Sequence, residues 1–64
     1  MHNNIKKYRK LLKLRQEDLA ESLSVTRQTI NAVELGKHDP SLKLALKLAE
    51  SFNCRVEELF VIGI

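Results

Sequence analysis

Three long polar side chains, Arg27, Gln28 and Asn31, are the residues of this chain best suited to recognition chemistry. They lie near the start of an expected helix that follows Thr26, whose hydroxyl can cap it. A helix that reads DNA must present such side chains near its N-terminus, where they can reach the edges of the bases. Arginine can bond guanine through two hydrogen bonds, and glutamine or asparagine can bond adenine. The pattern therefore predicts recognition of double-stranded DNA.

A second short helix is expected directly before this one, over about residues 16–23. The segment Ser24-Val25-Thr26 separates the two, with two hydroxyl residues and one β-branched residue. Two short helices joined by such a turn are typical of a helix-turn-helix. The first helix would pack on the second through small and apolar side chains, which are Leu19, Ala20 and Leu23 against Val25, Ile30 and Val33.

The remaining apolar spacing predicts an all-α fold of five helices around one core, in a single domain over residues 1–64. The expected helices cover about residues 3–14, 16–23, 26–35, 42–52 and 56–59. Either Asn3 or Asn4 can cap the first helix, Gly36 ends the third, and Ser41 caps the fourth. The fourth helix is expected to be the most buried, through a stripe of Leu42, Ala45, Leu46 and Ala49 that Leu44 and Leu48 widen.

The chain has 64 residues and a formal net charge of +3. A domain of this size buries only about 60% of the surface that its unfolded chain exposes, so we expect marginal stability, helped by association with a second copy. Residues 1–15 contain six basic side chains and no acidic one, which indicates a basic first helix suited to phosphates. No apolar run approaches the ~18 residues of a membrane span, and no secretory leader is visible, so we expect a cytoplasmic protein.

The other reactive residues do not combine into a catalytic or metal site. The acidic pairs at 17–18 and 57–58 are adjacent on expected helices, so their carboxylates point in different directions. The single cysteine, Cys54, allows no internal disulfide, and His2 and His38 are too far apart in the chain to suggest a structural zinc site. We therefore expect no enzyme, no cofactor, no metal and no small-molecule substrate.

Several spaced motifs together resemble the Cro/phage-repressor (Xre-type) helix-turn-helix regulators, over residues 5–60. They are Gln16-Glu17-Asp18-Leu19-Ala20, Val25-Thr26-Arg27-Gln28-Thr29-Ile30, Glu34-Leu35-Gly36-Lys37, Pro40-Ser41-Leu42 and Val56-Glu57-Glu58-Leu59-Phe60. The resemblance implies a compact lambda-repressor-like fold with the helix-turn-helix at its second and third helices. It also implies sequence-specific binding of double-stranded DNA, most often as a repressor of a prokaryote or phage, associated with the nucleoid when bound.

The resemblance also implies roles for individual residues. Arg27, Gln28 and Asn31 would contact bases, and Arg9 would form a structural ion pair with Glu34. Contacts to the DNA backbone would come from Gln16, Thr26, Lys37, Lys6 and Arg15. Arg15 departs from the family, whose members usually carry a capping serine or threonine there, so the cap is lost and a cation is gained.

The C-terminal segment, residues 59–64, has five apolar side chains and is the expected dimerisation segment. Leu59 and Phe60 could instead seal the core of the same chain. The remaining three could pair as antiparallel strands across a two-fold axis, pack on a partner, or fray; they are Val61, Ile62 and Ile64. A homodimer reading two half-sites is the first interpretation. The alternative is an antitoxin-like or controller protein that acts mainly through a protein partner.

Overall fold

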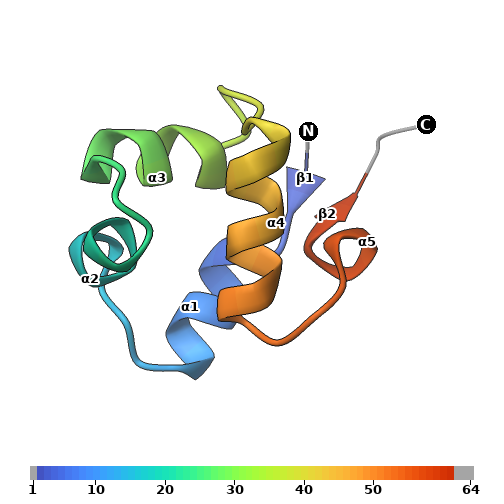
Figure 1. Ribbon diagram of the computed structural model, residues 1–64, viewed down its shortest axis with the longest axis horizontal. Helices are drawn as coiled ribbons and strands as arrows, with labels where there is room; N and C mark the ends of the chain where they lie inside the picture. The colour runs from blue at the N-terminus through green and yellow to red at the C-terminus, as the bar shows by residue number, and fades with distance from the viewer. Residues whose placement is uncertain (1, 62–64) are drawn as a thin grey trace.

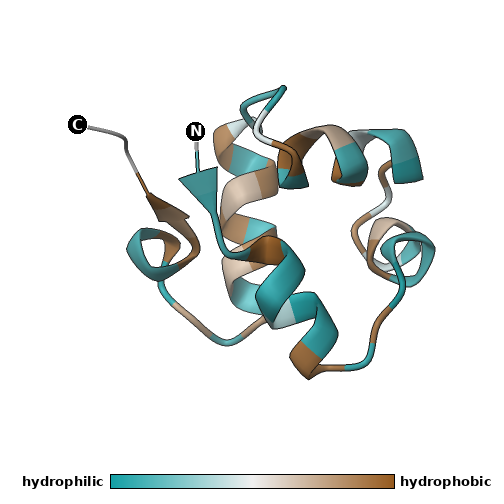
Figure 2. Ribbon diagram, turned by 180° about the vertical axis from the view of Figure 1, so that it is seen from behind, coloured by the Kyte–Doolittle hydropathy of each residue, from teal (hydrophilic) through white to brown (hydrophobic). Residues whose placement is uncertain are grey.

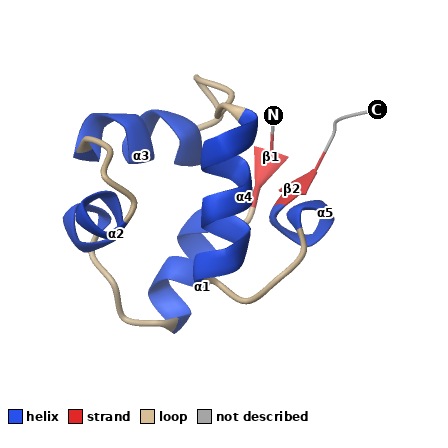
Figure 3. Cartoon of the chain, in the orientation of Figure 1, coloured by secondary structure: helices blue, strands red, loops and turns tan. Residues whose placement is uncertain are grey.

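The computed structural model describes residues 2–61, which form five helices and one two-stranded antiparallel ladder (Figures 1 and 3). The elements are β1 (His2–Asn3), α1 (Ile5–Leu11), α2 (Gln16–Ser22), α3 (Arg27–Glu34), α4 (Leu42–Ser51), α5 (Val56–Leu59) and β2 (Phe60–Val61). Helix α4 runs through the middle of the molecule, with α2 and α3 on one side and β1, β2 and α5 on the other (Figure 1). The predicted five-helix, all-α architecture is confirmed, with the short ladder as an addition.

The centre of the core receives at least one fully buried aliphatic side chain from every helix. These side chains are Ile5, Leu19, Ile30, Val33, Leu48 and Leu59. Since no helix exceeds ten residues, each one depends on this shared apolar contact rather than on its own helical propensity. Within residues 2–61, no helix is both long and apolar enough to cross a membrane.

Helices α1 to α4 all end in the same backbone arrangement, a Schellman motif. In α1, the Leu14 N–H donates to the Arg9 carbonyl at 3.0 Å and the Lys13 N–H donates to the Lys10 carbonyl at 3.0 Å. This motif requires one residue in the left-handed region, and Gly36 fills that place after α3 with a φ of 73°. The other three places are taken by residues with a Cβ atom, Lys13, Ser24 and Asn53. The first helix therefore ends at Leu11, short of the predicted residue 14.

The N-termini of the helices follow the sequence predictions only in part. The Thr26 hydroxyl accepts a hydrogen bond from the Thr29 N–H at 3.2 Å, and Ser41 caps α4 through the Leu44 N–H at 3.1 Å, as predicted. At α1 the cap position is Asn4, but the accepting oxygen belongs to Asn3, which takes the Ile5 N–H at 3.1 Å.

The ladder joins the two ends of the chain, pairing His2 with Val61 and Asn3 with Phe60 (Figure 3). The Asn4 N–H extends it by donating to the Leu59 carbonyl at 2.8 Å. The apolar β2 lies beside the polar β1 (Figure 2). The sequence analysis did not foresee this pairing within one chain: residues 2–3 supply the partner strand. Leu59 and Phe60 seal the core of their own chain, which is one of the alternatives that the sequence left open.

The predicted stripe of α4 is wrong in two of its four main positions. Leu42 and Leu46 are 73% and 53% exposed, and the buried face is formed by Leu44, Ala45, Leu48 and Ala49. Two overlapping stripes with helical spacing exist in this leucine-rich segment, so spacing alone does not choose between them. Which stripe of α4 is buried depends on the neighbouring helices, because the buried stripe must face both α3 and α5.

Leu46 and Leu48 offer a matched test of this correction, since they are the same residue type on one helix. We expect Leu48→Ala, at a site with 0% exposure, to lower the free energy of unfolding by about 2–5 kcal/mol because it leaves a cavity. Leu46→Ala should change it by less than about 0.5 kcal/mol. Urea denaturation followed by far-UV circular dichroism measures both, and equal losses would contradict the assigned face.

Candidate nucleic-acid interface

Helices α2 and α3 form the predicted helix-turn-helix, joined by residues 23–26. Leu19, Ala20 and Leu23 are buried on the α2 side, and Ile30 and Val33 are buried on the α3 side. The turn is made possible by Ser24, which adopts a φ of 57°, so that the Val25 N–H reaches the Ala20 carbonyl at 3.0 Å. Apolar packing therefore holds α3 from behind and leaves its other face to solvent.

The exposed face of α3 brings together the three side chains predicted to contact bases. Arg27, Gln28 and Asn31 are all exposed and line one shallow depression. Within residues 2–61, the Arg27 and Gln28 side chains form no hydrogen bond, so their donors and acceptors are available to a ligand. Arginine and amide groups presented together on a protruding helix are suited to the hydrogen-bonding edges of the DNA major groove.

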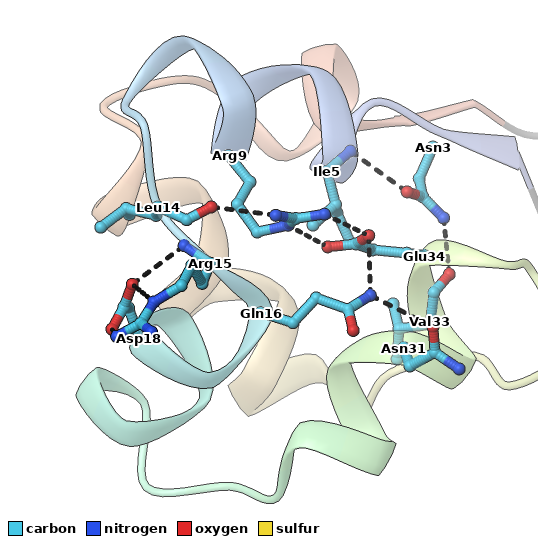
Figure 4. A network of polar contacts seen from close by, with 10 residues as sticks. All are labelled: Asn3, Ile5, Arg9, Leu14, Arg15, Gln16, Asp18, Asn31, Val33 and Glu34. Atoms are coloured by element: carbon cyan, nitrogen blue, oxygen red, sulfur yellow. Dashed lines mark hydrogen bonds and ion pairs between the residues drawn. The ribbon is translucent and has the colours of Figure 1, made fainter.

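Behind this face, Arg9 of α1 and Glu34 of α3 form a bidentate ion pair (Figure 4). The Arg9 Nε donates to the Glu34 Oε2 at 2.7 Å, and its Nη2 donates to the Oε1 at 3.2 Å. The Arg9 Nη1 donates to the Leu14 carbonyl at 2.9 Å. The two charged side chains are only 11% and 4% exposed, so the pair is screened from water and fixes α1 against α3.

Gln16, at the first position of α2, links this ion pair to the exposed face of α3 (Figure 4). Its Nε2 donates to the Glu34 Oε1 at 3.2 Å and to the Asn31 Oδ1 at 3.1 Å. Both side-chain hydrogens are therefore used within the protein. The backbone N–H of Gln16 is one of the donors that the first turn of a helix leaves unbonded. Sequence reasoning missed the link to Asn31, because it depends on how α2 crosses α3.

Arg15 is held by two acidic neighbours on the exposed start of α2. Its guanidinium donates to both oxygens of Asp18 at 3.1 Å and lies 3.0 Å from a Glu17 oxygen. The Asp18 carboxylate also accepts the Arg15 backbone N–H at 3.0 Å, which is the half of a capping box that the third helical residue supplies. The other half is missing, because an arginine side chain cannot accept a hydrogen bond from the first turn of the helix. The hydrogen bond from the Arg15 side chain lowers the pKa of Asp18, and the same contact raises the pKa of Arg15.

The other residues predicted to contact the DNA backbone are separate from this network. Thr26 is exposed at the start of α3, where its hydroxyl caps the helix, and Lys37 is exposed directly after Gly36. Lys6 is exposed on α1, outside the helix-turn-helix.

Cys54 is a partly buried thiol beside Tyr8, whose ring stacks on Phe52 with centroids 5.6 Å apart. Burial, followed by the negative charge of Glu58, raises the pKa of the Cys54 thiol, which disfavours the reactive thiolate. Among residues 2–61, no three histidine, cysteine or acidic side chains gather as a metal site would require. The interface on α3 is therefore the best-developed candidate site.

Comparison with known proteins agrees with this geometry. A family model described as helix-turn-helix matches residues 5–59. The chain belongs to the Xre-type helix-turn-helix family. Members of this family are DNA-binding transcriptional regulators, and the resemblance inferred from the sequence motifs is thereby confirmed.

Relatives within the helix-turn-helix family come from both archaea and bacteria. A protein of Methanocaldococcus jannaschii named as an HTH-type transcriptional regulator is 56% identical over 61 residues, which are 95% of this chain and 92% of that protein. One from Archaeoglobus fulgidus is 44% identical, over 95% of this chain and 86% of the relative. One from Bacillus subtilis is 43% identical, over 94% and 91%.

The buried ion pair makes a sharp stability prediction. We expect Arg9→Met to lower the free energy of unfolding by about 3–5 kcal/mol, because it leaves the Glu34 carboxylate buried without its counterion. Urea denaturation measures the loss, and adding Glu34→Leu to Arg9→Met should recover much of it. As a control, Arg15→Met, which breaks only exposed ion pairs, should have a small effect. Similar losses from the two arginine variants would contradict the assigned role.

Proposed function

We propose that this protein is a sequence-specific transcriptional regulator of double-stranded DNA, acting as a repressor in the cytoplasm of a prokaryote. Helix α3 lies in the major groove, where Arg27, Gln28 and Asn31 contact base edges. One observation supports the proposal above all: these three side chains are exposed together on one face of α3, while the opposite face is packed into the core. The protein works by binding, not by catalysis.

Contacts to the phosphates hold α3 in register on the duplex. Thr26 lies directly before α3 and Lys37 lies three residues after it, so they contribute from both ends of the helix. Gln16 contributes its backbone N–H, since its side-chain hydrogens are occupied. Lys6 and Arg15 supply positive charge from the basic stretch of residues 1–15, and Arg15 exchanges its acidic partners for phosphate.

A homodimer on a palindromic operator completes the proposal. An open groove of about 660 Å³ lies at the end of the molecule remote from α2, and apolar side chains of α4, α5 and β2 dominate its lining. Leu42 and Val61 lie in this lining and are 73% and 48% exposed. Of the residues predicted for the dimer interface, we therefore keep Val61 and add Leu42. Leu59 and Phe60 are buried in the core of their own chain. Ile62 and Ile64 lie outside the described residues.

The dimensions of one protomer fit this arrangement. Half-sites one helical turn apart require two recognition helices separated by about 34 Å, which places each about 17 Å from the two-fold axis. The protomer is 32 Å long, and α5 and β2, which line the groove, lie toward the other end of it from α2 and the start of α3 (Figure 1). Two copies joined at the groove can therefore present both α3 helices to one side of a duplex.

Base recognition is tested by Gln28→Ala. We expect it to cost about 1–3 kcal/mol of binding free energy and to relax the preference at one base pair, because the amide hydrogen bonds to that base are lost. Lys37→Ala should instead weaken binding to all sequences and flatten the salt dependence. Selection of bound sites from random DNA, followed by titrations at several salt concentrations, measures both. Equal losses on specific and random DNA for Gln28→Ala would exclude direct recognition by this residue.

The dimer is tested with two exposed leucines of α4, of which only Leu42 lines the groove. Sedimentation of the wild-type protein at micromolar concentration should give about twice the chain mass of 7.4 kDa. Leu42→Asp should raise the dimer dissociation constant at least ~10-fold, because it places a charge in an apolar contact. Leu46→Asp should leave that constant unchanged, and equal effects of the two variants would locate the interface elsewhere.

A second candidate function follows from the same groove: an antitoxin-like or controller protein in which the groove binds a different protein. An apolar surface of this kind is suited to either partner. The sedimentation experiment separates the two, since this alternative predicts a wild-type chain that stays monomeric or aggregates when it is alone.

A further inference from the structure

The hydrogen bonds around Gln16 form a continuous chain from the buried ion pair to the surface that is proposed to read DNA (Figure 4). Arg9 holds the Glu34 carboxylate, Glu34 accepts from the Gln16 Nε2, and the same Nε2 donates to the Asn31 Oδ1. Exposure rises along this chain of bonds, from the Glu34 side chain at 4% to Asn31, which is exposed. The buried ion pair is therefore rigid, and it constrains the orientation of the amide groups of Gln16 and Asn31.

The buried end determines which way each amide must face. A carboxylate paired with a guanidinium accepts hydrogen bonds and has none to donate. Gln16 must therefore turn its NH₂ group, not its carbonyl oxygen, toward Glu34. The second hydrogen of that NH₂ group points at Asn31, so Asn31 must turn its own oxygen inward to accept it.

This orientation leaves the NH₂ group of Asn31 without a hydrogen-bond partner within residues 2–61, on an exposed residue that lines one depression with Arg27 and Gln28. A freely rotating asparagine can bond adenine through both edges of its amide, donating to N7 and accepting from the N6 amino group. With its oxygen turned inward to Gln16, Asn31 presents outward its NH₂ group, which can only donate. Guanine presents two acceptors in the major groove, N7 and O6, whereas adenine presents one acceptor beside an amino donor.

We propose that Gln16 fixes the amide of Asn31 so that this position of α3 presents only hydrogen-bond donors and selects guanine over adenine. The inference rests on the proposed function, since it requires that α3 reads DNA. Gln16 acts as a positioning residue: it sets the specificity of Asn31 without touching the base. Arg27 and Gln28, whose side chains form no hydrogen bond within residues 2–61, have no such constraint.

The orientation is tested first without DNA. In nitrogen-15 NMR spectra of the free protein, the side-chain NH₂ hydrogens of Gln16 should exchange with water at least ~5-fold more slowly than those of the exposed Gln28, because both are hydrogen-bonded. Equal exchange of the two glutamine side chains would overturn the proposal, whatever the DNA experiments give.

The specificity is tested by selecting bound sites from random DNA with four proteins: wild type, Asn31→Ala, Gln16→Met and the double variant. Asn31→Ala identifies the base pair that Asn31 reads, since preference there should disappear. Gln16→Met keeps the length of the side chain and removes its donors. At that base pair, we expect it to reduce the preference for guanine over adenine about 5-fold or more, because Asn31 can then also present its oxygen.

The double variant shows whether Gln16 acts through Asn31. If it does, the double variant should match Asn31→Ala at that base pair, with no added effect of Gln16→Met. If Gln16→Met weakens binding to all sequences equally and keeps the guanine preference, the proposal is wrong and the role of Gln16 is confined to stability or phosphate binding. A wild-type protein that enriches no sequence would instead overturn the proposed function, and this inference with it. Far-UV circular dichroism checks that each variant is folded.

Discussion

The buried ion pair between Arg9 and Glu34 is the interaction on which the rest of the proposed DNA-binding face depends. A charged side chain that water cannot reach must find its partners within the protein. Glu34 takes them from Arg9 and Gln16, and Arg9 gives its remaining bond to the Leu14 carbonyl at the end of α1. Three helices thus meet at one carboxylate. The position of α3 relative to α1 and α2 is fixed by directional bonds as well as by apolar packing, which alone tolerates sliding.

The exposed face of α3 and the apolar groove, the two surfaces proposed for binding, differ in their physical chemistry. The α3 end carries polar side chains, of which Asn31 is held by a directional network, and hydrogen bonds of this kind distinguish between partners of similar shape. The groove end presents exposed leucine and valine side chains, where association depends on the apolar area removed from water and only weakly on direction. This difference suits the proposed roles, in which the α3 face selects a DNA sequence and the groove binds a second copy of the chain.

Most of the fold was predictable from the sequence, because helix starts and polar motifs depend on local chemistry. Thr26, Ser41 and Gly36 each act within a few residues of their own position, and their predicted roles are confirmed. The end of α1 was not predictable, since Lys13 adopts a left-handed conformation that its residue type disfavours. The buried face of α4, the terminal ladder and the bond from Gln16 to Asn31 were also missed. Each of these depends on which segments meet in space, and periodicity carries no information on that.

The terminal ladder has a consequence for the order in which the protein can be completed during synthesis. Residues 2–4 are synthesised more than fifty residues before residues 58–61, which are their hydrogen-bond partners. Asn3, held in this ladder, also donates to the Val33 carbonyl at 2.7 Å near the end of α3. Helix α3, the proposed recognition helix, therefore gains this last support only when translation has passed residue 61. A chain interrupted before residue 59 lacks Leu59 and Phe60 in its core and cannot form the ladder, so the last residues of β2 are needed before the fold can close.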